Sequence, residues 1–449
     1  MPAERRPSIP PGPWLVVGLE RSGAACARAL WARGEPVIGV DIGEPEQAAA
    51  LRHEGIEIAT ASDGVEELER ARALVRSPGV PNEAAVLVAA RAAGIPIYSE
   101  LELGWRMLES PFVAVTGTNG KTTTVELLGE IWRACGRPVV VAGNVGTAVS
   151  SLVGGIGPET TVICEASSFQ LEDSVAFAPE VAVLLNIEPD HLDRHGDFGS
   201  YRSAKLELFA HQGGGEIAVG SAEMLALADG DAKRVTISTD AGASADLELR
   251  DGLICWQGTA LMAASEVRLR GAHNLENAFC AAAAALSSGI DGEAVASALR
   301  SFAGVEHRLE ELGTSGGVLW VNDSKATNVA SAVVALAAFD QPLILIAGGE
   351  AKGQEFAALA DCAAASVRSA FLIGSDAELI AAQFDGIVEY ELCASLEQAV
   401  MAAHEKAEAG EVVLLSPACA SFDQFAGGFA QRGAEFRRIV QALPGFLSS

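Results

Sequence analysis

A glycine-containing loop separates an apolar stretch from a helix-forming stretch. It reads Thr116-Gly-Thr-Asn-Gly-Lys-Thr122, with Thr123 after it, and follows the apolar run Phe112 to Val115. Glycines let the backbone wrap closely around a phosphate, and a helix N-terminus presents unpaired N–H groups to it. In such a loop the lysine reaches the β- and γ-phosphates and the Thr122 hydroxyl contacts Mg²⁺. Val115 replaces the usual first glycine, so we interpret the segment as a variant phosphate loop.

Two candidate metal ligands follow later apolar runs. Glu165 stands directly after Thr161 to Cys164, and His191 follows the run that begins at Val181. Parallel sheets place their sites at the carboxyl ends of strands, where both residues are expected. A carboxylate and an imidazole suit Mg²⁺ or Mn²⁺ when phosphate oxygens and water complete the coordination.

A second glycine loop lies near the N-terminus. Gly18-Leu-Glu-Arg-Ser-Gly23 resembles a dinucleotide fingerprint, and Asp41 follows at about the expected 20 residues. Glu20 replaces the middle glycine, and its carboxylate would crowd and repel a pyrophosphate. The loop alone is therefore weak support for an NAD site.

The elements that must position these residues fall into three α/β segments. Each begins with a short apolar strand, a glycine turn and a helical pattern, which predicts parallel sheets. We expect an N-terminal Rossmann-like domain at 1–109, a central phosphate-loop ATPase domain at 110–312 and a C-terminal Rossmann-like domain at 313–449. Alternating patterns predict antiparallel strands added to the central domain at 216–270. We expect Gly313 to Gly317 to be a linker.

Composition narrows the class of protein. The 449 residues carry a formal net charge of −28, which argues against a nucleic-acid or membrane-surface binder. No apolar run reaches about 18 residues, and the polar start, Met1 to Pro13, lacks the apolar core of a signal peptide. The eight cysteines form no CxxC pair. These features predict a cytoplasmic protein with reduced thiols, no membrane insertion and no zinc site.

Six motifs occur in the order seen in the Mur ligases, and the resemblance covers nearly the whole chain. They are Thr116 to Thr123, Glu165 to Leu171, Asn186 to Asp193, His273 to Asn277, His307-Arg308, and Asp323 to Asn328. The run Ser416-Pro-Ala-Cys-Ala-Ser-Phe-Asp-Gln-Phe425 is similar to that of the glutamate-adding members. The Asp-Asn-Pro-Arg motif typical of the diaminopimelate-adding members is absent.

The resemblance implies an ATP-dependent amide-bond ligase of peptidoglycan precursor synthesis, and so a part in cell wall biogenesis, cell shape, cell division and the cell cycle. The carboxylate of UDP-N-acetylmuramoyl-L-alanine becomes an acyl phosphate, and the glutamate amine then displaces phosphate, leaving ADP and phosphate. The implied partners are these small molecules. The implied cofactors are ATP and two Mg²⁺ ions, with Mn²⁺ possible, and the protein is expected to be a monomer. D-glutamate is the expected amino acid, although the sequence does not settle its stereochemistry.

The resemblance also assigns residues. Lys121, His191 and Lys205 are the implied catalytic residues, and Thr122, Glu165, His191 and Lys205 (as a carbamate) are the implied metal ligands. The implied ATP-binding residues are Gly117, Thr118, Asn119, Gly120, Lys121, Thr122, Thr123, Asn277, Arg308 and Asp323. The implied UDP-substrate residues are Leu19, Glu20, Asp41, Gly79 and Asn144. The implied glutamate-binding residues are Thr327, Lys352, Ser421, Phe422 and Phe429, where Gly427-Gly428 lengthens the loop before Phe429.

Two alternatives stay open. A related Mur ligase or a folylpolyglutamate synthetase would add another amino acid, although the folate enzyme begins with its ATPase domain. An NAD-binding dehydrogenase or redox module would explain the first glycine loop but not Thr116 to Thr123.

Overall fold

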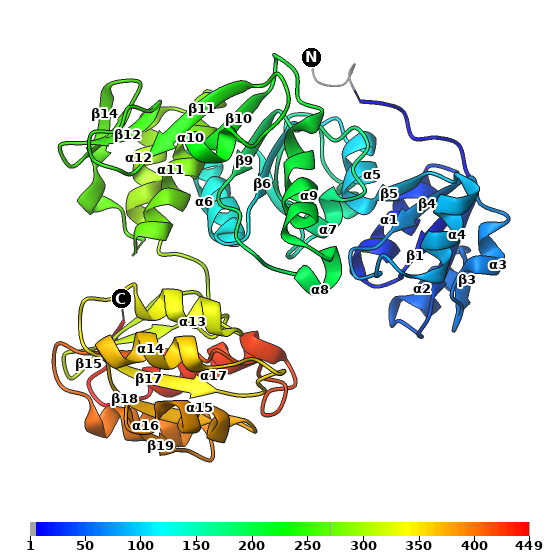
Figure 1. Ribbon diagram of the computed structural model, residues 1–449. Coiled ribbons are helices and arrows are strands. Elements are labelled where there is room, and N and C mark those ends of the chain that lie inside the picture. The colour runs from blue at the N-terminus through cyan, green and yellow to red at the C-terminus, as the bar shows by residue number, and fades with distance from the viewer. Residues whose placement is uncertain (1–5, 270, 449) are drawn as a thin grey trace. The chain divides into compact units, whose positions relative to one another are not determined.

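The computed structural model describes residues 6–269 and 271–448, and it divides into two compact units. Unit 1 comprises the residues up to 268 together with 273–302, and unit 2 comprises 269–272 and the residues from 303 onward. The described residues form three sheets, two in unit 1 and one in unit 2 (Figure 1). The predicted three-part α/β class is confirmed, with a parallel first sheet and a central sheet that carries added antiparallel strands. The C-terminal sheet, expected to be Rossmann-like, is mixed, because Glu310–Ser315 pairs in antiparallel fashion with both of its neighbours. In the described part of the chain, no helix combines the length and apolarity needed to cross a membrane.

The first sheet is fully parallel, with strand order β3-β2-β1-β4-β5. Its β1 is buried because Trp14, Leu15, Val16 and Val17 are packed on both faces. The strand order reverses beside β1, so the carboxyl ends of β1 and β4 form a crevice where ligands bind in such folds. The elements are β1 (Trp14–Val17), α1 (Arg21–Ala32), β2 (Val37–Asp41), α2 (Gln47–His53), β3 (Glu57–Thr60), α3 (Val65–Leu68), β4 (Ala73–Arg76), α4 (Ala85–Ala93), β5 (Ile97–Ser99) and α5 (Glu100–Met107).

The central sheet has the order β14-β13-β12-β11-β10-β9-β6-β8-β7. Its phosphate-loop strand β6 lies between β8 and β9, and α6 and α9 flank it in Figure 1. The elements are β6 (Phe112–Thr116), α6 (Lys121–Ala134), β7 (Val139–Gly143), β8 (Thr161–Glu165), α7 (Ser168–Leu171), β9 (Val181–Leu184), α8 (Leu192–His195), α9 (Phe198–Ala210), β10 (Ile217–Ser221), α10 (Ala222–Leu225), β11 (Lys233–Ser238), β12 (Leu247–Arg250), β13 (Leu253–Trp256), β14 (Thr259–Ala263), α11 (Ala272–Ser287) and α12 (Gly292–Ser301).

The prediction of antiparallel strands in 216–270 is only partly right. β10, β11 and β12 continue the parallel sheet, and only β12, β13 and β14 pair in antiparallel fashion. Short turns join β12, β13 and β14, which permits hairpins, whereas α10 and a longer segment allow parallel crossovers before them.

The sheet of unit 2 has the order β19-β18-β17-β20-β16-β15-β21 and is parallel from β19 to β16. Its elements are β15 (Glu310–Ser315), β16 (Val318–Asn322), α13 (Val329–Leu336), β17 (Leu343–Gly348), α14 (Ala357–Ser366), β18 (Val367–Ile373), α15 (Ala377–Phe384), β19 (Glu389–Leu392), α16 (Leu396–Lys406), β20 (Val412–Leu415), α17 (Gly428–Gln441) and β21 (Leu447–Ser448).

The expectation that Gly313 to Gly317 form a linker is wrong. Gly313 lies in β15, and Gly316 and Gly317, with φ of 60° and 81°, turn the chain into β16. Two consecutive residues of positive φ match the twist of a tight hairpin, which explains why glycines stand there. The expected boundary at 312 thus falls inside β15, whereas unit 2 takes the chain from Ala303.

Candidate active site

Asn186, which follows β9, hydrogen-bonds to the backbone of the phosphate loop. The N–H of Thr118 donates to the Asn186 carbonyl at 2.9 Å, and the N–H of Asn119 donates to its Oδ1 at 2.8 Å. Gly120 has φ +83°, a conformation that residues with a Cβ rarely adopt. The loop thus leads directly into the first turn of α6, whose N–H groups are suited to an anion.

Two lysine side chains converge on one loop carbonyl. The Nζ of Lys121 donates to the carbonyls of Gly117 and Thr118, both at 2.9 Å, and the Nζ of Lys205 donates to the same Gly117 oxygen at 2.6 Å. Lys205 projects from α9 and is only 2% exposed. Burial, and next the positive charge of Lys121, lowers the pKa of Lys205 to about 7. The Lys205 amine is therefore neutral in an appreciable fraction of molecules near neutral pH.

Tyr201 lies one helical turn before Lys205 on α9 and supports this centre. Its ring centroid is 4.6 Å from the Lys205 Nζ, and its hydroxyl is 3.0 Å from the Thr118 Oγ1. Burial raises the pKa of Tyr201 to about 12, so the phenol stays protonated.

Glu165, at the end of β8, is the buried carboxylate of the site. Its Oε2 accepts from the Thr122 hydroxyl at 2.9 Å, and its Oε1 accepts from the Asn144 Nδ2 at 2.9 Å. Both of these donors are neutral, and the Glu165 side chain is only 2% exposed. Adjacent hydroxyl and carboxylate oxygens are the donors that Mg²⁺ prefers, so Thr122 and Glu165 fit that ion.

The described residues contain no group of three or more His, Cys, Asp or Glu side chains that could hold a metal by themselves. Mg²⁺ commonly takes one or two protein ligands and completes its shell with water and substrate phosphates. A nucleotide would therefore have to share any ion at Glu165.

His191 begins α8 and has φ 49°, a left-handed conformation. Its ring centroid lies 5.0 Å from that of Phe169, and the side chain is half exposed. The strand before it, β9, ends at Leu184, so His191 sits on the following loop and not directly at the strand end.

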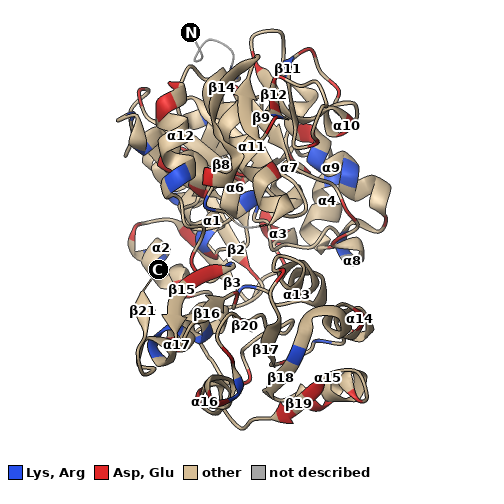
Figure 2. Ribbon diagram, turned by 90° about the vertical axis from the view of Figure 1, so that its left-hand side faces the viewer, with Lys and Arg blue, Asp and Glu red and all other residues tan. Residues whose placement is uncertain are grey.

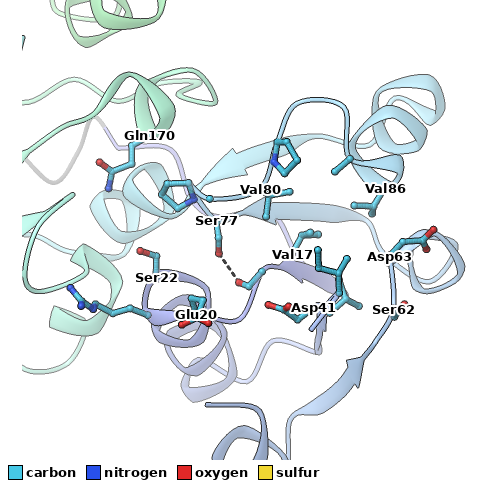
Figure 3. Close-up of a pocket in the computed structure, with 18 of the residues that line it drawn as sticks. Val17, Glu20, Ser22, Asp41, Ser62, Asp63, Ser77, Val80, Val86 and Gln170 are labelled. Carbon is cyan, nitrogen blue, oxygen red and sulfur yellow. Dashed lines mark hydrogen bonds between the residues drawn. The ribbon is translucent and has the colours of Figure 1, made fainter. Parts of the chain in front are cut away.

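A pocket of roughly 710 Å³ lies at the carboxyl ends of β1 and β4. Figure 3 shows Asp41, Ser62 and Asp63 toward one end, Ser77 and Glu20 between, and Gln170 toward the other end. The Ser77 hydroxyl donates to the Gly18 carbonyl at 2.6 Å.

Four of the five predicted sugar-nucleotide residues line this pocket, namely Glu20, Asp41, Gly79 and Asn144. Leu19 does not, because its side chain is fully buried in the core of the first sheet. Its backbone is part of the first glycine loop, and its N–H donates to Asp41 Oδ2 at 2.7 Å.

A cluster of two arginines ties the pocket wall to the segment around His191. The Val80 carbonyl, in the pocket wall, accepts from Arg76 Nε and Nη2 at 3.0 and 2.9 Å and from Arg194 Nη2 at 3.0 Å. Arg76 also pairs with Asp173 at 3.0 Å, and the Arg194 guanidinium lies 4.1 Å from the centre of the Phe169 ring. Arg194 is the third residue of α8, the helix that His191 caps.

Two further predicted ATP residues lie beside the phosphate loop in unit 1. A Cβ on Gly120 would come within 2.2 Å of the Asn277 Oδ1, so the amide of Asn277 packs against the loop glycine. The Oγ1 of Thr123 is buried and has no hydrogen-bond partner among the described residues.

The remaining predicted ATP residues, Arg308 and Asp323, belong to unit 2. The Asp323 carboxyl accepts from the Ser416 hydroxyl at 2.8 Å and from the Leu309 N–H at 3.2 Å. Burial raises the pKa of Asp323 to about 7, against the opposing effects of these hydrogen bonds and of the Arg308 charge.

Three loops of unit 2 bring the predicted glutamate residues together. The loop after β17 pairs with the loop after β20 through a bridge between Glu350 and Ala420. This places Lys352 near Phe422, with the ammonium 5.2 Å from the ring centre. The Ser421 hydroxyl is buried and unpartnered within the described chain.

The third loop follows β16 and carries Thr327. Phe429 lies beside it, because its carbonyl accepts from the Ser324 hydroxyl at 2.8 Å and its ring is 5.7 Å from the Lys325 Nζ. The longer loop at Gly427-Gly428, which we interpret as one inserted residue, therefore leaves Phe429 within this group of loops.

The sequence interpretation missed Arg432, which is 1% exposed. Its guanidinium donates to the carbonyls of Ser324 at 2.9 Å and Cys419 at 3.1 Å, in two of these loops, and of Gly348 at 3.4 Å, at the end of β17 where the third loop begins. A sequence signal existed, because Arg432 precedes the buried Phe436 and Val440 at helical spacing on α17.

Gln170 and Tyr201 were also missed. Gln170 belongs to the motif Glu165 to Leu171 and lines the pocket. Its side chain is 1% exposed, and its Nε2 has no hydrogen-bond partner among the described residues. Tyr201 stands four residues before Lys205, a spacing that places both on one helix face.

Comparison with known protein families matches three models along the chain. The models described as "Mur ligase MurD-like, N-terminal domain", "Mur ligase middle domain" and "Mur ligase, glutamate ligase domain" match residues 13–99, 115–285 and 307–419.

Curated relatives match along almost their whole length. UDP-N-acetylmuramoylalanine–D-glutamate ligase from Pelotomaculum thermopropionicum is 40% identical over 96% of this chain and 97% of its own. The proteins of the same name from Geotalea daltonii and Salinibacter ruber are 40% and 39% identical, with 96% and 95% of this chain covered and 97% of each relative.

Solved structures share the fold. UDP-N-acetylmuramate–alanine ligase from Thermotoga maritima aligns with a TM-score of 0.58 at 19% identity, covering 96% of this chain and 99% of that one. A pseudomurein peptide ligase type C from Methanothermus fervidus gives 0.58 at 17% identity, covering 95% and 99%. With the relatives at about 40% identity, these matches lead to one conclusion: the chain belongs to the Mur ligase family, in its group of UDP-N-acetylmuramoylalanine–D-glutamate ligases.

Proposed function

We propose that this chain uses ATP to join D-glutamate to UDP-N-acetylmuramoyl-L-alanine, an amide-forming step of peptidoglycan precursor synthesis. The names and the near-complete coverage of the relatives support this substrate pair. A carboxylate is a poor acyl donor because oxide would have to leave. Transfer of the γ-phosphoryl group makes an acyl phosphate, from which the amino acid's amine displaces phosphate.

The convergence of Lys121 and Lys205 on the Gly117 carbonyl carries the proposal. Phosphoryl transfer depends mainly on positioning and on stabilising charge at the transferring group. Lys121 is the residue we assign to the β- and γ-phosphates, and its present contacts hold the ammonium at the loop where those phosphates would arrive. The backbone of Gly117, Thr118, Asn119 and Gly120, with Thr122 and Thr123, forms the rest of the cradle.

We assign Thr122 and Glu165 to one Mg²⁺, and His191 with a carbamate of Lys205 to a second. When bound, such ions neutralise charge on the phosphates and the acceptor carboxylate. Formation of a carbamate requires a neutral amine, and the lowered pKa of Lys205 supplies one at neutral pH. Asn144 orients the Glu165 carboxylate through its amide.

The sugar nucleotide occupies the pocket beside β1 and β4 in this proposal. Asp41 fixes the first glycine loop, Glu20 and Gly79 line the wall, and Asn144 and Gln170 lie at the end nearest the central sheet. Leu19 contributes only its backbone.

Unit 2 carries the residues assigned to the amino acid. Within unit 2 we also assign Arg308 and Asp323 to nucleotide binding, and within unit 1 we assign Asn277 to it. Thr327, Lys352 and Ser421 are assigned to the glutamate carboxylates, for which charge-assisted and hydroxyl hydrogen bonds are suited. Phe422 and Phe429 are assigned to its hydrocarbon part.

We further propose that the enzyme acts as a cytoplasmic monomer. All eight cysteines are unpaired, as expected in a reducing compartment. We assign the sugar nucleotide to the domain at 1–109 together with Asn144 and Gln170, ATP mainly to the domain at 110–312, and the amino acid to unit 2.

A phosphate-release assay with ATP, Mg²⁺ and UDP-N-acetylmuramoyl-L-alanine tests the reaction against a panel of D- and L-amino acids. Phosphate should appear with D-glutamate and not with the other amino acids. Lys121→Ala and Lys205→Ala should each lower turnover by at least about a hundredfold, because each removes charge or a ligand at the transferring group.

Lys233→Ala, on the exposed part of β11, is the matched control and should keep normal turnover. Release of phosphate with an amino acid other than glutamate would reassign the substrate. Normal turnover in Lys121→Ala would remove the phosphate loop from the mechanism.

A further inference from the structure

The sugar-nucleotide pocket has an unexpected charge balance. Its described lining includes three acidic residues, Glu20, Asp41 and Asp63, and a single Lys or Arg, which is Arg21. A nucleoside diphosphate brings further negative charge into this lining. Its binding therefore needs a local cation.

Two of the three carboxylates already serve the loops that build the pocket. Asp41 accepts from the Leu19 N–H at 2.7 Å and from the Gly43 N–H at 2.8 Å. Asp63 accepts from the Val65 N–H at 3.1 Å. These backbone N–H donors stabilise the negative charges of Asp41 and Asp63.

Glu20 is different, because it stands at the N-cap of α1 without a side-chain capping bond. It is exposed, and it occupies the place where a dinucleotide loop has a glycine that allows close approach of a pyrophosphate. Its carboxylate adds negative charge beside the end of the helix that otherwise favours an anion.

Arg21 is the first residue of α1, and its Nη1 donates to the Gly146 carbonyl at 2.8 Å. Gly146 lies in the turn that also holds Asn144, so this bond keeps the guanidinium on the pocket's side of the helix. The bond uses one of five N–H donors, and the planar fork of a guanidinium matches two oxygens of a phosphate.

A separate observation indicates that the pocket is built for a polar ligand. The Gln170 Nε2 is buried and unpartnered among the described residues, although the Gln170 Oε1 accepts from the Ser167 N–H at 3.1 Å. Gln170 lines the same pocket from the far end. A buried amide donor of this kind lacks an acceptor until a ligand arrives.

We propose that Arg21 is the residue that recognises the diphosphate of the sugar nucleotide, and that Glu20 opposes it. Arg21 then favours a diphosphate over an uncharged nucleoside, because only the diphosphate gains a charge-assisted hydrogen bond from it, and Glu20 weakens this preference by repelling the diphosphate. This inference rests on the proposed function for the identity of the ligand.

Competition calorimetry with the full chain, using UDP and uridine as probes, tests the proposal. Arg21→Ala should weaken UDP binding by about tenfold and change uridine binding by less than about twofold, as expected for loss of a charge-assisted hydrogen bond. Arg21→Lys should fall between, because it keeps the charge and loses the fork. Glu20→Gln should tighten UDP binding by about threefold at low salt.

Arg28→Ala is the matched control, because Arg28 lies on α1 and pairs with Glu54 away from this pocket. It removes the same charge and should leave UDP binding unchanged. Equal weakening of UDP and uridine by Arg21→Ala, or the same loss in Arg28→Ala, would overturn the assignment. Failure of the unmodified protein to bind UDP would instead overturn the proposed substrate.

Discussion

Burial of the Asp323 carboxyl raises its pKa in the folded chain. Its pKa is raised from 3.8 to about 7, so between these values the folded state holds a proton that the unfolded state has released. Stability then falls as pH rises through this range, because the unfolded state binds fewer protons than the folded state. The contribution is fully present below the unfolded pKa and is lost once pH passes the folded pKa.

We therefore expect Asp323→Asn to flatten the pH dependence of stability in unit 2. Hydrogen–deuterium exchange of β16 should show protection that falls from pH 5 to pH 8 in the unmodified protein, after correction for the intrinsic exchange rate. The variant should lack the part of this fall due to Asp323. His307 titrates in both proteins and cancels in the difference. Identical slopes would contradict the assigned burial effect.

Individual residues of the candidate site were predictable when a motif fixed their type and spacing. Lys121 and Thr122 follow from the phosphate loop, and Glu165 from its place after a strand. The shared contact of Lys121 and Lys205 with Gly117 was not predictable, because α9 reaches the loop only through tertiary packing. The burial of the Leu19 side chain was not anticipated from the glycine loop, because an apolar side chain gains more from the core than from a polar pocket.

The turn between β6 and α6 depends on Gly120. Gly120→Ala would place a Cβ 2.2 Å from the Asn277 Oδ1 and force a left-handed conformation that costs about 1–2 kcal/mol for a residue with a side chain. Asn277 must then move, so the KM for ATP should rise by about tenfold or more. Steady-state kinetics with varied ATP measures the effect.

Gly136→Ala, just past the other end of α6, is the matched control. Gly136 has φ 70°, and a Cβ there meets nothing within 4 Å. It should lose similar stability without changing the KM for ATP. Equal KM changes in the two variants would show that the Asn277 contact is unimportant.

Most helices and strands could be predicted from apolar periodicity, including β1, β6, α6, β16 and β20. Strand direction in 216–270 was less accessible, because alternation reveals a strand but not its partner. Gly316 and Gly317 were read as part of a linker for a related reason, since the same glycines also suit a hairpin turn.

The net charge of −28 affects the molecule as a whole. Asp and Glu are spread over helices and loops of both units (Figure 2). Like charges at this density repel one another in the compact state. Added salt shortens the screening length from about 10 Å at 0.1 M to about 3 Å at 1 M, and so weakens the repulsion.

We expect the thermal midpoint at pH 8 to rise by a few degrees when KCl increases from about 0.02 to about 1 M. The same increase at a pH close to the sequence pI of 4.6 should have little effect, because the net charge is then small. Differential scanning calorimetry measures both. A midpoint that falls with KCl at pH 8 would show that surface ion pairs outweigh the repulsion.

The Val80 carbonyl has a mechanical consequence for unit 1. It accepts from guanidiniums of both Arg76 and Arg194, so the rim of the pocket proposed for the sugar nucleotide and the turn that carries His191 share one hydrogen-bond acceptor. If that rim shifts as the substrate enters, either these bonds stretch or α8 follows. Under the proposed function, we expect a movement of this rim on substrate binding to move α8, and with it His191, while the sheets stay as they are.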